Sequence, residues 1–341
     1  MRKIIPALIV LSLLSIFLGG VYIGPVGLSP SDVTSGIAYG GVKVTLSRFF
    51  PFNLGEPPKY FSIIWKIRLP EVLLAYLVGL SLASAGVASQ ALFRNPLADP
   101  YIIGISSGAA FGAALSLLVG ITYMPYLSLA FSFLSVFIVY SLARTNGKVP
   151  VDTLLLAGIA YGFLANAATW YIYVTHPHNA YITWTWLLGS FNGAEWKEVL
   201  IMLVVSSLGT GFLIWKWREL NLILLGEESI ALGLDLHLYR KVFLGVIATL
   251  TAFAVYTSGV IGFVGLVSPP HIMRIILGPN HRELTPSTAL FGGILLVLAD
   301  LLARTVAKPQ VIPVGIITAF MGAPFFLYLL MKHKRGGELM R

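Results

Sequence analysis

Residues 72–93 read VLLAYLVGLSLASAGVASQALF, and no Asp, Glu, Lys or Arg interrupts them. A run of this length and composition predicts one helix that crosses a lipid bilayer, which needs about 20 mostly apolar residues. Arg94 follows the run directly, and basic residues at the ends of apolar runs are a signal for the orientation of membrane helices. This stretch therefore predicts a helical membrane protein.

Seven further uncharged runs occur, at residues 4–26, 101–143, 153–175, 199–215, 242–273, 284–299 and 310–331. The run at 101–143 is long enough for two helices, with a break near Tyr123, Met124 and Pro125. The run at 242–273 predicts a long helix and a short one, because Gly262 to Pro270 lie inside it. The pattern predicts an all-α polytopic membrane protein with about ten transmembrane helices in one domain, residues 1–341.

The composition supports a membrane protein. Of the 341 residues, 57% are hydrophobic and 11% are charged, and the mean hydropathy is +0.85. Soluble domains carry about 25% charged residues. The net charge of +9 is assigned to loops at helix ends rather than to nucleic-acid binding. The chain has no cysteine, which excludes disulfides and thiolate metal sites.

The distribution of Lys and Arg predicts the topology. With the N-terminus in the cytoplasm and ten helices, both termini are cytoplasmic, and the larger share of the 23 Lys and Arg residues lies on that side. Residues 27–67 then form an external segment, in which Ser29, Pro30 and Asp32 predict a helix start. The alternative for residues 1–20 is a cleaved signal peptide, but we see no clear small-x-small cleavage site near Gly19.

Small residues indicate where helices pack closely. Gly104, Gly108 and Gly112 recur every fourth residue, and Gly158 and Gly162 do so once. This spacing lets helix backbones approach each other in lipid.

Motifs for common catalytic and nucleotide-binding chemistry are missing. The only Gly-Lys pair, Gly147-Lys148, is followed by Val, so the sequence has no phosphate-binding loop, and H-E-x-x-H is also absent. His176 and His178 flank a proline on a predicted external loop and are expected to be solvated rather than metal-bound. The chain is predicted not to be an enzyme and to hold no metal.

Several segments carry a family resemblance. Residues 68–70 read RLP, 90–100 read QALFRNPLADP, 262–267 read GFVGLV, 270–272 read PHI and 312–319 read IPVGIITA. In this order they resemble the FecCD family, the permeases of ABC importers for iron-siderophores, haem and vitamin B12. Two positions differ from the family pattern. Glu71 stands where relatives commonly have Arg, and Pro269 adds a second proline before Pro270 and His271.

The resemblance implies a multi-pass permease of the cell membrane that pairs with a second copy of itself. It also implies two ATP-binding cassette ATPase subunits, which would hold the Mg-ATP, and an external binding protein that delivers the substrate. No cofactor is expected in this chain. The resemblance places the ATPase contact in the cytoplasmic loop 218–241, here named the coupling loop. Its contact residues would be Leu225, Gly226, Glu227, Glu228, Ala231, Leu232 and Gly233, on two short amphipathic helices separated by Gly233.

Other roles implied by the resemblance concern docking, gating and the substrate path. Arg68 and Arg304 would dock acidic residues of the binding protein; Arg304 can also pair with Asp300 at i,i+4 spacing. The cytoplasmic gate would include the following residues: Asn95, Leu97, Val151 and Asp152. Asp152 can instead cap the helix that follows it. The path wall would include Asn166, Trp170 and Phe320.

The sequence disfavours two other function classes. An ion-coupled secondary transporter needs charges within its helices or a repeat of broken helices, and the uncharged runs disfavour it. A membrane-embedded enzyme needs a polar cluster at membrane depth, whereas His271 is the only histidine inside an apolar run. Family frequency ranks a ferric siderophore first as substrate, then cobalamin, then haem, with an oxyanion such as molybdate as the outside choice.

Overall fold

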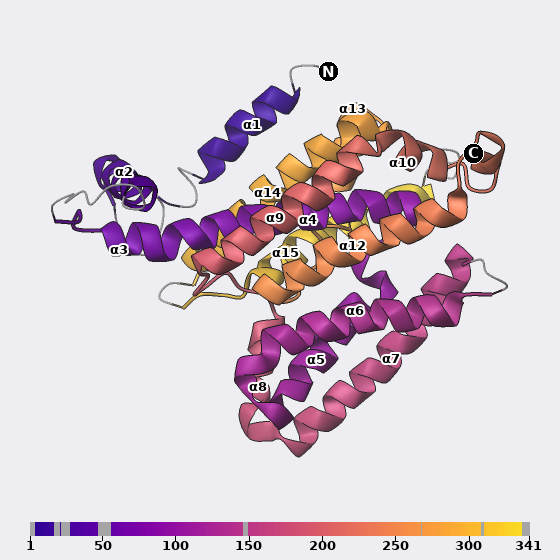
Figure 1. Ribbon diagram of the computed structural model, residues 1–341, viewed down its shortest axis with the longest axis horizontal. Helices are drawn as coiled ribbons and strands as arrows, with labels where there is room; N and C mark the ends of the chain where they lie inside the picture. The colour runs from indigo at the N-terminus through magenta and orange to yellow at the C-terminus, as the bar shows by residue number, and fades with distance from the viewer. Residues whose placement is uncertain are drawn as a thin grey trace.

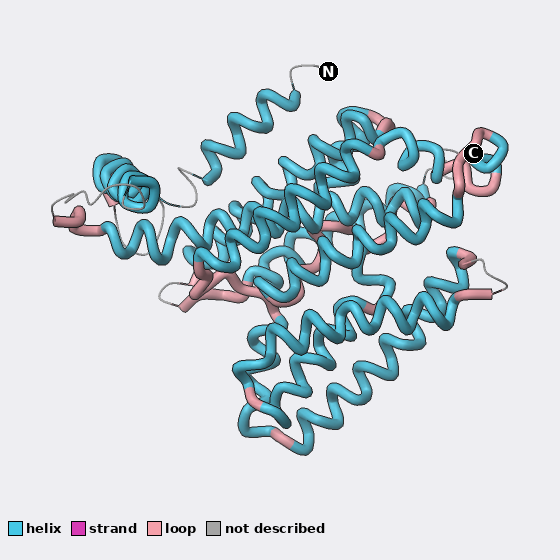
Figure 2. Tube along the Cα trace, in the orientation of Figure 1, coloured by secondary structure: helices cyan, strands magenta, loops and turns pink. Residues whose placement is uncertain are grey.

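The computed structural model describes residues 4–16, 21, 28–46, 56–145, 149–266, 268–307 and 310–335. These residues are almost entirely helical, and Figure 2 shows no strand among them. The α-helices are α1 Ile4–Leu14, α2 Pro30–Leu46, α3 Phe61–Ile63, α4 Leu69–Phe93, α5 Ile105–Val119, α6 Met124–Ala143, α7 Val151–Thr175, α8 Pro177–Leu187, α9 Trp196–Trp215, α10 Trp217–Ile223, α11 Glu228–Ala231, α12 Leu236–Ser258, α13 Ser268–Leu277, α14 His281–Thr305 and α15 Val314–Arg335.

The helix lengths confirm the all-α membrane fold. Within the described residues, six helical segments are long and apolar enough to cross a membrane, and α1, α5 and most of α15 are shorter apolar helices. Helix α13 has 10 residues. The count of ten spans therefore stays a prediction. The first predicted span, 4–26, is described only over 4–16 and at Val21.

Helix α4 forms the centre of the molecule, with α9, α12 and α14 around it (Figure 1). Nearly every α4 side chain is buried by the neighbouring helices. Gly79 of α4 and Gly292 of α14 lie in backbone contact, so a Cβ at either position would collide with the other helix. The fold thus depends on small residues where two central helices cross.

Helices α5, α6, α7 and α8 form a second group, drawn below the central helices in Figure 1. Gly108 and Gly112 of α5 face the backbone of α6 without room for a Cβ, and Gly158 of α7 faces Ile102 in the same way. Gly104, by contrast, has φ +85° at the start of α5, so it serves the turn rather than the helix contact. The predicted close packing of small residues is confirmed at Gly108, Gly112 and Gly158, whereas a Cβ at Gly162 would meet only the side chain of Ser107.

Local signals explain several helix boundaries. Ser29 and Asp32 form a reciprocal cap at the start of α2, since Asp32 Oδ2 accepts from Ser29 N at 2.9 Å and Ser29 Oγ accepts from Asp32 N at 3.1 Å. These hydrogen bonds with Ser29 hold the pKa of Asp32 below its usual value. The predicted helix start is therefore confirmed. Helix α13 begins at Ser268, so Pro269 and Pro270 fall in its first turn, where proline is tolerated.

Helices α4 and α14 extend beyond the uncharged runs that predicted them. A π-helical turn over Ile64–Arg68 leads into α4, and α14 runs on to Thr305, so Arg68, Glu71, Asp300 and Arg304 all lie on helical segments. An uncharged run ends, by definition, at a charged residue, so the predicted runs excluded these four positions. Here Glu71 and Asp300 pair with Arg304, which lets the helices continue through these charged positions.

Candidate functional site

The coupling loop contains two short helices, α10 and α11, and they are separated by residues 224–227. Gly226, with φ +64°, lies in this connection. The prediction that Gly233 separates them is wrong: Gly233, with φ +85°, lies after α11 and separates it from α12. Both glycines adopt the left-handed conformation that side chains disfavour, so spacing in the sequence did not distinguish them.

The outer half of the coupling loop, residues 225–233, exposes apolar side chains. Leu225 is 45%, Ile230 48% and Leu232 61% exposed, whereas Ser229 is fully buried and bonds back to Gly226 O. Among the residues assigned to ATPase contact, Gly226 is buried and the following six are exposed: Leu225, Glu227, Glu228, Ala231, Leu232 and Gly233. Exposed leucines on a charged loop are suited to insertion into an apolar groove of a soluble partner.

The loop is attached to the helix bundle at two further points. Arg240 Nη2 of α12 lies 3.6 Å from Glu227 Oε1. Gly226 faces the guanidinium of Arg94, which follows α4 with φ 50°, and a Cβ at Gly226 would collide with it. The end of α4 therefore contacts the coupling loop directly, a contact that sequence reasoning missed.

The inner half of the loop is held by a polar junction. Glu219 Oε1 of α10 accepts from Lys216 Nζ at 2.8 Å and from Tyr239 OH of α12 at 3.2 Å. Partial burial acts to raise the pKa of Glu219, but these hydrogen bonds outweigh it and hold the pKa below its ordinary value. Glu219 therefore stays ionised at neutral pH and joins α10 to α12 and to Lys216, the residue between α9 and α10.

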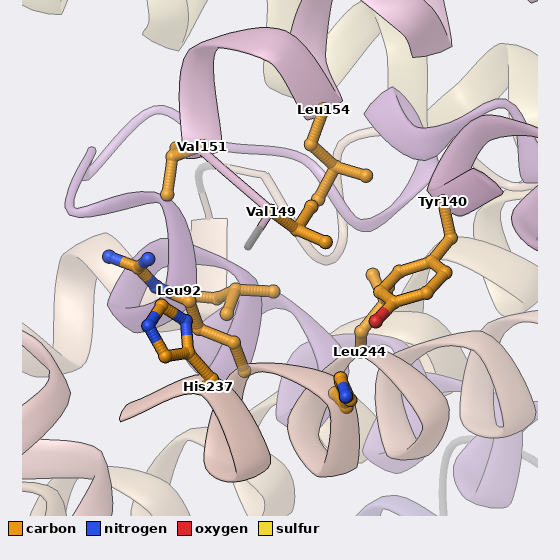
Figure 3. Close-up of a pocket in the computed structure, with 9 residues that line it drawn as sticks. Leu92, Tyr140, Val149, Val151, Leu154, His237 and Leu244 are labelled. Atoms are coloured by element: carbon orange, nitrogen blue, oxygen red, sulfur yellow. The ribbon is translucent and has the colours of Figure 1, made fainter. Parts of the chain in front are cut away.

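The four predicted gate residues lie near the predicted cytoplasmic ends of α4 and α7, but they do not form one ring in the single chain. Asn95 Oδ1 accepts from Leu97 N at 2.9 Å, so its side chain closes its own turn. Val151 lines a small cavity of about 20 Å³ with Leu92 and Leu154. Figure 3 shows Val149, Val151 and Leu154 arranged opposite Leu92 and His237.

Asp152 does not cap α7. The cap position is Pro150, no side chain accepts a hydrogen bond there, and Asp152 is an exposed residue of the first turn. A carboxylate in a first turn is favourable because the N-terminus of a helix carries partial positive charge. The alternative role predicted for Asp152 is thus wrong, and its place at the gate stays a prediction.

The predicted path residues are exposed in the single chain. Trp170 is 62% and Phe320 76% exposed, and Asn166 is also exposed on α7. Phe320 lines an open, mostly apolar cavity of about 590 Å³ between the end of α8 and α15, together with Leu188, Val260 and Pro324. No α7 residue lines this cavity, so the single chain does not bring the three predicted path residues together.

Arg68 and Arg304 lie together at the predicted external end, but both are buried, with 3% and 7% of their surface exposed. Arg304 contacts Asp300 at 2.5 Å and Glu71 at 3.6 Å, and Arg68 Nη1 donates to Val21 O at 2.8 Å. The predicted pair of Arg304 with Asp300 is confirmed. We name Arg68, Glu71, Asp300 and Arg304 the external ionic cluster.

The external ionic cluster lines a cavity of about 260 Å³ with Ile63, Asn192 and Val311. Glu71, the residue that differs from the family pattern, also accepts from Gly193 N at 3.3 Å. Its carboxylate therefore offsets the charge of the cluster and ties α4 to the turn before α9. In the single chain the arginines face this cavity rather than bulk solvent.

Among the described residues, no group of three or more His, Asp or Glu side chains is placed to hold a metal ion. His176 Nδ1 lies 2.9 Å from Thr175 Oγ1, and the His271 ring packs edge-on against Phe325. These two histidines therefore make ordinary structural contacts.

Comparison with known proteins relates this architecture to one family. The model described as the FecCD transport family matches residues 7–332. The chain is 41% identical over 316 residues to the cobalamin import system permease protein BtuC of Halobacterium salinarum, which covers 90% of this chain and 85% of that protein. It is 36% identical over 289 residues to the vitamin B12 import system permease protein BtuC of Citrobacter koseri, covering 82% and 87%.

A solved structure has the same fold over almost the entire chain. It is an inward-facing conformation assigned to the metal-chelate type of ABC transporter. It superimposes with a TM-score of 0.83 at 30% identity, covering 97% of this chain and 100% of that one.

Proposed function

The chain belongs to the FecCD transport family and is a multi-pass membrane permease of the ABC importer type, and we propose that it translocates a metal chelate as a homodimer. Two separate ATPase subunits drive the cycle from the cytoplasm, and an external binding protein delivers the substrate. The observation that carries this proposal is the coupling loop, whose exposed Leu225, Ile230 and Leu232 lie beside charged residues.

A partner that covers these leucines gains apolar burial, at about 25 cal/mol per Å² removed from water. The buried inner half of the loop, with Leu220 and Ile223, anchors this surface to the bundle. A loop that is anchored to the bundle and exposes apolar side chains is better suited to binding a soluble ATPase and transmitting its movement than to remaining uncovered in water. It also accounts for a membrane protein whose sequence has no phosphate-binding loop of its own.

The open cavity beside Phe320 supports a path that is completed by a second copy of the chain. A wall that passes a bulky chelate should bind it weakly, so that the ligand can leave. The apolar cavity residues around Phe320 and the exposed α7 face with Trp170 fit such a wall. Within the substrate class, the relatives named as cobalamin permeases make cobalamin the first ligand to test, followed by ferric siderophores.

Intact-complex mass spectrometry after gentle detergent purification of the tagged chain from its host tests the proposal. The expected complex contains two copies of this chain and two copies of a P-loop ATPase. A binding protein that co-purifies with the complex is then titrated with cyanocobalamin and with a ferric hydroxamate siderophore. A complex that never contains an ATPase contradicts the proposal and favours an ion-coupled secondary transporter.

A further inference from the structure

Helix α10 of the coupling loop is joined to the start of α14 by an amide network. Asn221 Oδ1 accepts from the backbone N of His281 at 3.0 Å and lies 2.7 Å from its ring Nδ1. Asn221 Nδ2 donates to Asn280 Oδ1 at 3.1 Å, and the same oxygen accepts from Arg282 N at 3.1 Å. Asn221 therefore reaches across 59 residues of sequence to cap another helix.

Two backbone groups fix the orientation of this network. A backbone N–H can only donate, so the atom of Asn221 facing His281 N and the atom of Asn280 facing Arg282 N are both oxygens. The remaining Asn221 atom is then the NH2 group, which donates to Asn280. Because Asn221 Oδ1 accepts, His281 Nδ1 carries the proton in this contact. His281 is fully buried, so water cannot replace the bond.

The first turn of α14 depends on these caps. The N–H groups of His281 and Arg282 have only these side-chain acceptors, and Pro286 in the next turn lacks the N–H that would bond back to this turn. A second contact strengthens the joint, because the Arg282 guanidinium lies 5.8 Å from the centre of the Trp217 ring of α10. Helix α10 and the start of α14 are thus held as one unit.

Helix α14 connects this unit to the opposite end of the molecule. It has 25 residues, which corresponds to about 37 Å at 1.5 Å per residue. Its far end carries Asp300 and Arg304 of the external ionic cluster, and Gly292 fixes its middle against α4. Figure 1 shows α10 and α2 at opposite ends of the bundle that α14 spans.

We infer that Asn221 is a positioning residue that ties the coupling loop to α14, so that movement of the loop by the ATPase is passed to the external ionic cluster. The inference rests on the proposed function, since it assigns a route between the two partner surfaces. Coupling between two sites is a free energy and is reciprocal, typically a 5- to 150-fold change in affinity. Nucleotide state on the cytoplasmic side should therefore change the affinity of the external binding protein through this joint.

The test uses the complete complex in nanodiscs, with its ATPase and binding protein. The dissociation constant of the binding protein is measured without nucleotide and after trapping with ATP and vanadate, and the ratio of the two values reports coupling. We expect Asn221→Ala to bring the ratio of the two dissociation constants at least 5-fold closer to one. The dissociation constant measured without nucleotide should change less than 2-fold. Asn221→Asp keeps the acceptor for His281 and should retain more than half of the wild-type ratio.

Thr210→Val is the control, because it removes a buried hydrogen bond of the bundle, from Thr210 Oγ1 of α9 to Ser84 Oγ of α4 at 2.9 Å, outside the coupling loop and α14. It should lower stability comparably but leave the ratio unchanged. A wild-type ratio in Asn221→Ala, or equal losses of the ratio in Asn221→Ala and Thr210→Val, would overturn the inference. A wild-type ratio of one would overturn it as well. Failure of the wild-type chain to bind an ATPase at all would instead reject the proposed function.

Discussion

Glu71 determines the charge of the external ionic cluster. Its carboxylate faces Arg304, which also pairs with Asp300, so two acids offset the two arginines around the cavity of about 260 Å³. An acidic residue of a docking partner has to compete with Glu71 for Arg304. Intramolecular pairing therefore lowers the affinity that the arginines could otherwise provide.

We predict that Glu71→Gln binds the external binding protein about 3- to 10-fold more tightly, a gain of up to about 1.4 kcal/mol. The amide keeps an acceptor for Gly193 but removes the negative charge from Arg304. The measurement is a surface-binding titration of the purified complex at low and high salt, with the gain smaller at high salt. Glu56→Gln is the matched control, because Glu56 is an exposed carboxylate in the predicted external segment. Equal affinities of the two variants would show that the cluster does not take part in docking.

Single residues also mark where sequence reasoning reaches its limit. The i,i+4 pair of Asp300 and Arg304 was predictable because both residues lie on one helix. The contacts of Asn221 with His281 and of Gly226 with Arg94 were not, since each joins segments far apart in the chain. A signal for Asn221 did exist: it is a polar residue that lies on a short helix between the buried Leu220 and Ile223.

At the scale of helices, the sequence predicts that a helix is present better than it predicts the residues at which the helix begins and ends. Apolar runs located the long helices because lipid requires every backbone polar group to be bonded within a helix. They ended α4 and α14 too early, because buried charges that pair with one another do not stop a helix. The linker in the coupling loop was assigned to the wrong glycine for a related reason, since both Gly226 and Gly233 have positive φ and only tertiary contacts distinguish them.

The crossing of α4 and α14 gives a prediction at this scale. Gly292→Val places side-chain atoms against Ala83 and the backbone of Gly79, so the helices must separate. We expect a loss of about 1–3 kcal/mol or more, as for overpacked cores, because close backbone approach is what stabilises such crossings in lipid. The measurement is the temperature at which half of the detergent-solubilised protein loses its monodisperse peak.

The matched control for this crossing is Gly211→Val on α9, where a Cβ meets no atom within 4 Å. Both substitutions add the same side chain to a membrane helix. The Gly211 variant should lose no more than a small part of the stability lost by the Gly292 variant. If both variants melt at the wild-type temperature, the crossing tolerates a side chain and the glycine contact does not hold the helices together.

At the scale of the whole molecule, the proposed function predicts that exposed apolar side chains on the spanning helices face either lipid or a path completed by a second copy. Leu208 of α9 is 70% exposed, Trp170 of α7 is 62% and Phe320 of α15 is 76% exposed. Their exposed fractions do not distinguish the two surroundings. Water does distinguish them, because a substrate path is hydrated at least during part of the transport cycle, whereas lipid excludes water.

The chain has no cysteine, so single-cysteine variants can report on these surroundings without removing native thiols. We predict that Trp170→Cys and Phe320→Cys in the assembled complex react with a water-soluble maleimide at least 10-fold faster than Leu208→Cys. A thiol reacts as its thiolate, which forms in water and not in hydrocarbon. Equal rates at all three positions would contradict a path along α7 and α15. Fast reaction at Leu208 alone would place the path on the face of α9, and the second copy would then have to pack there.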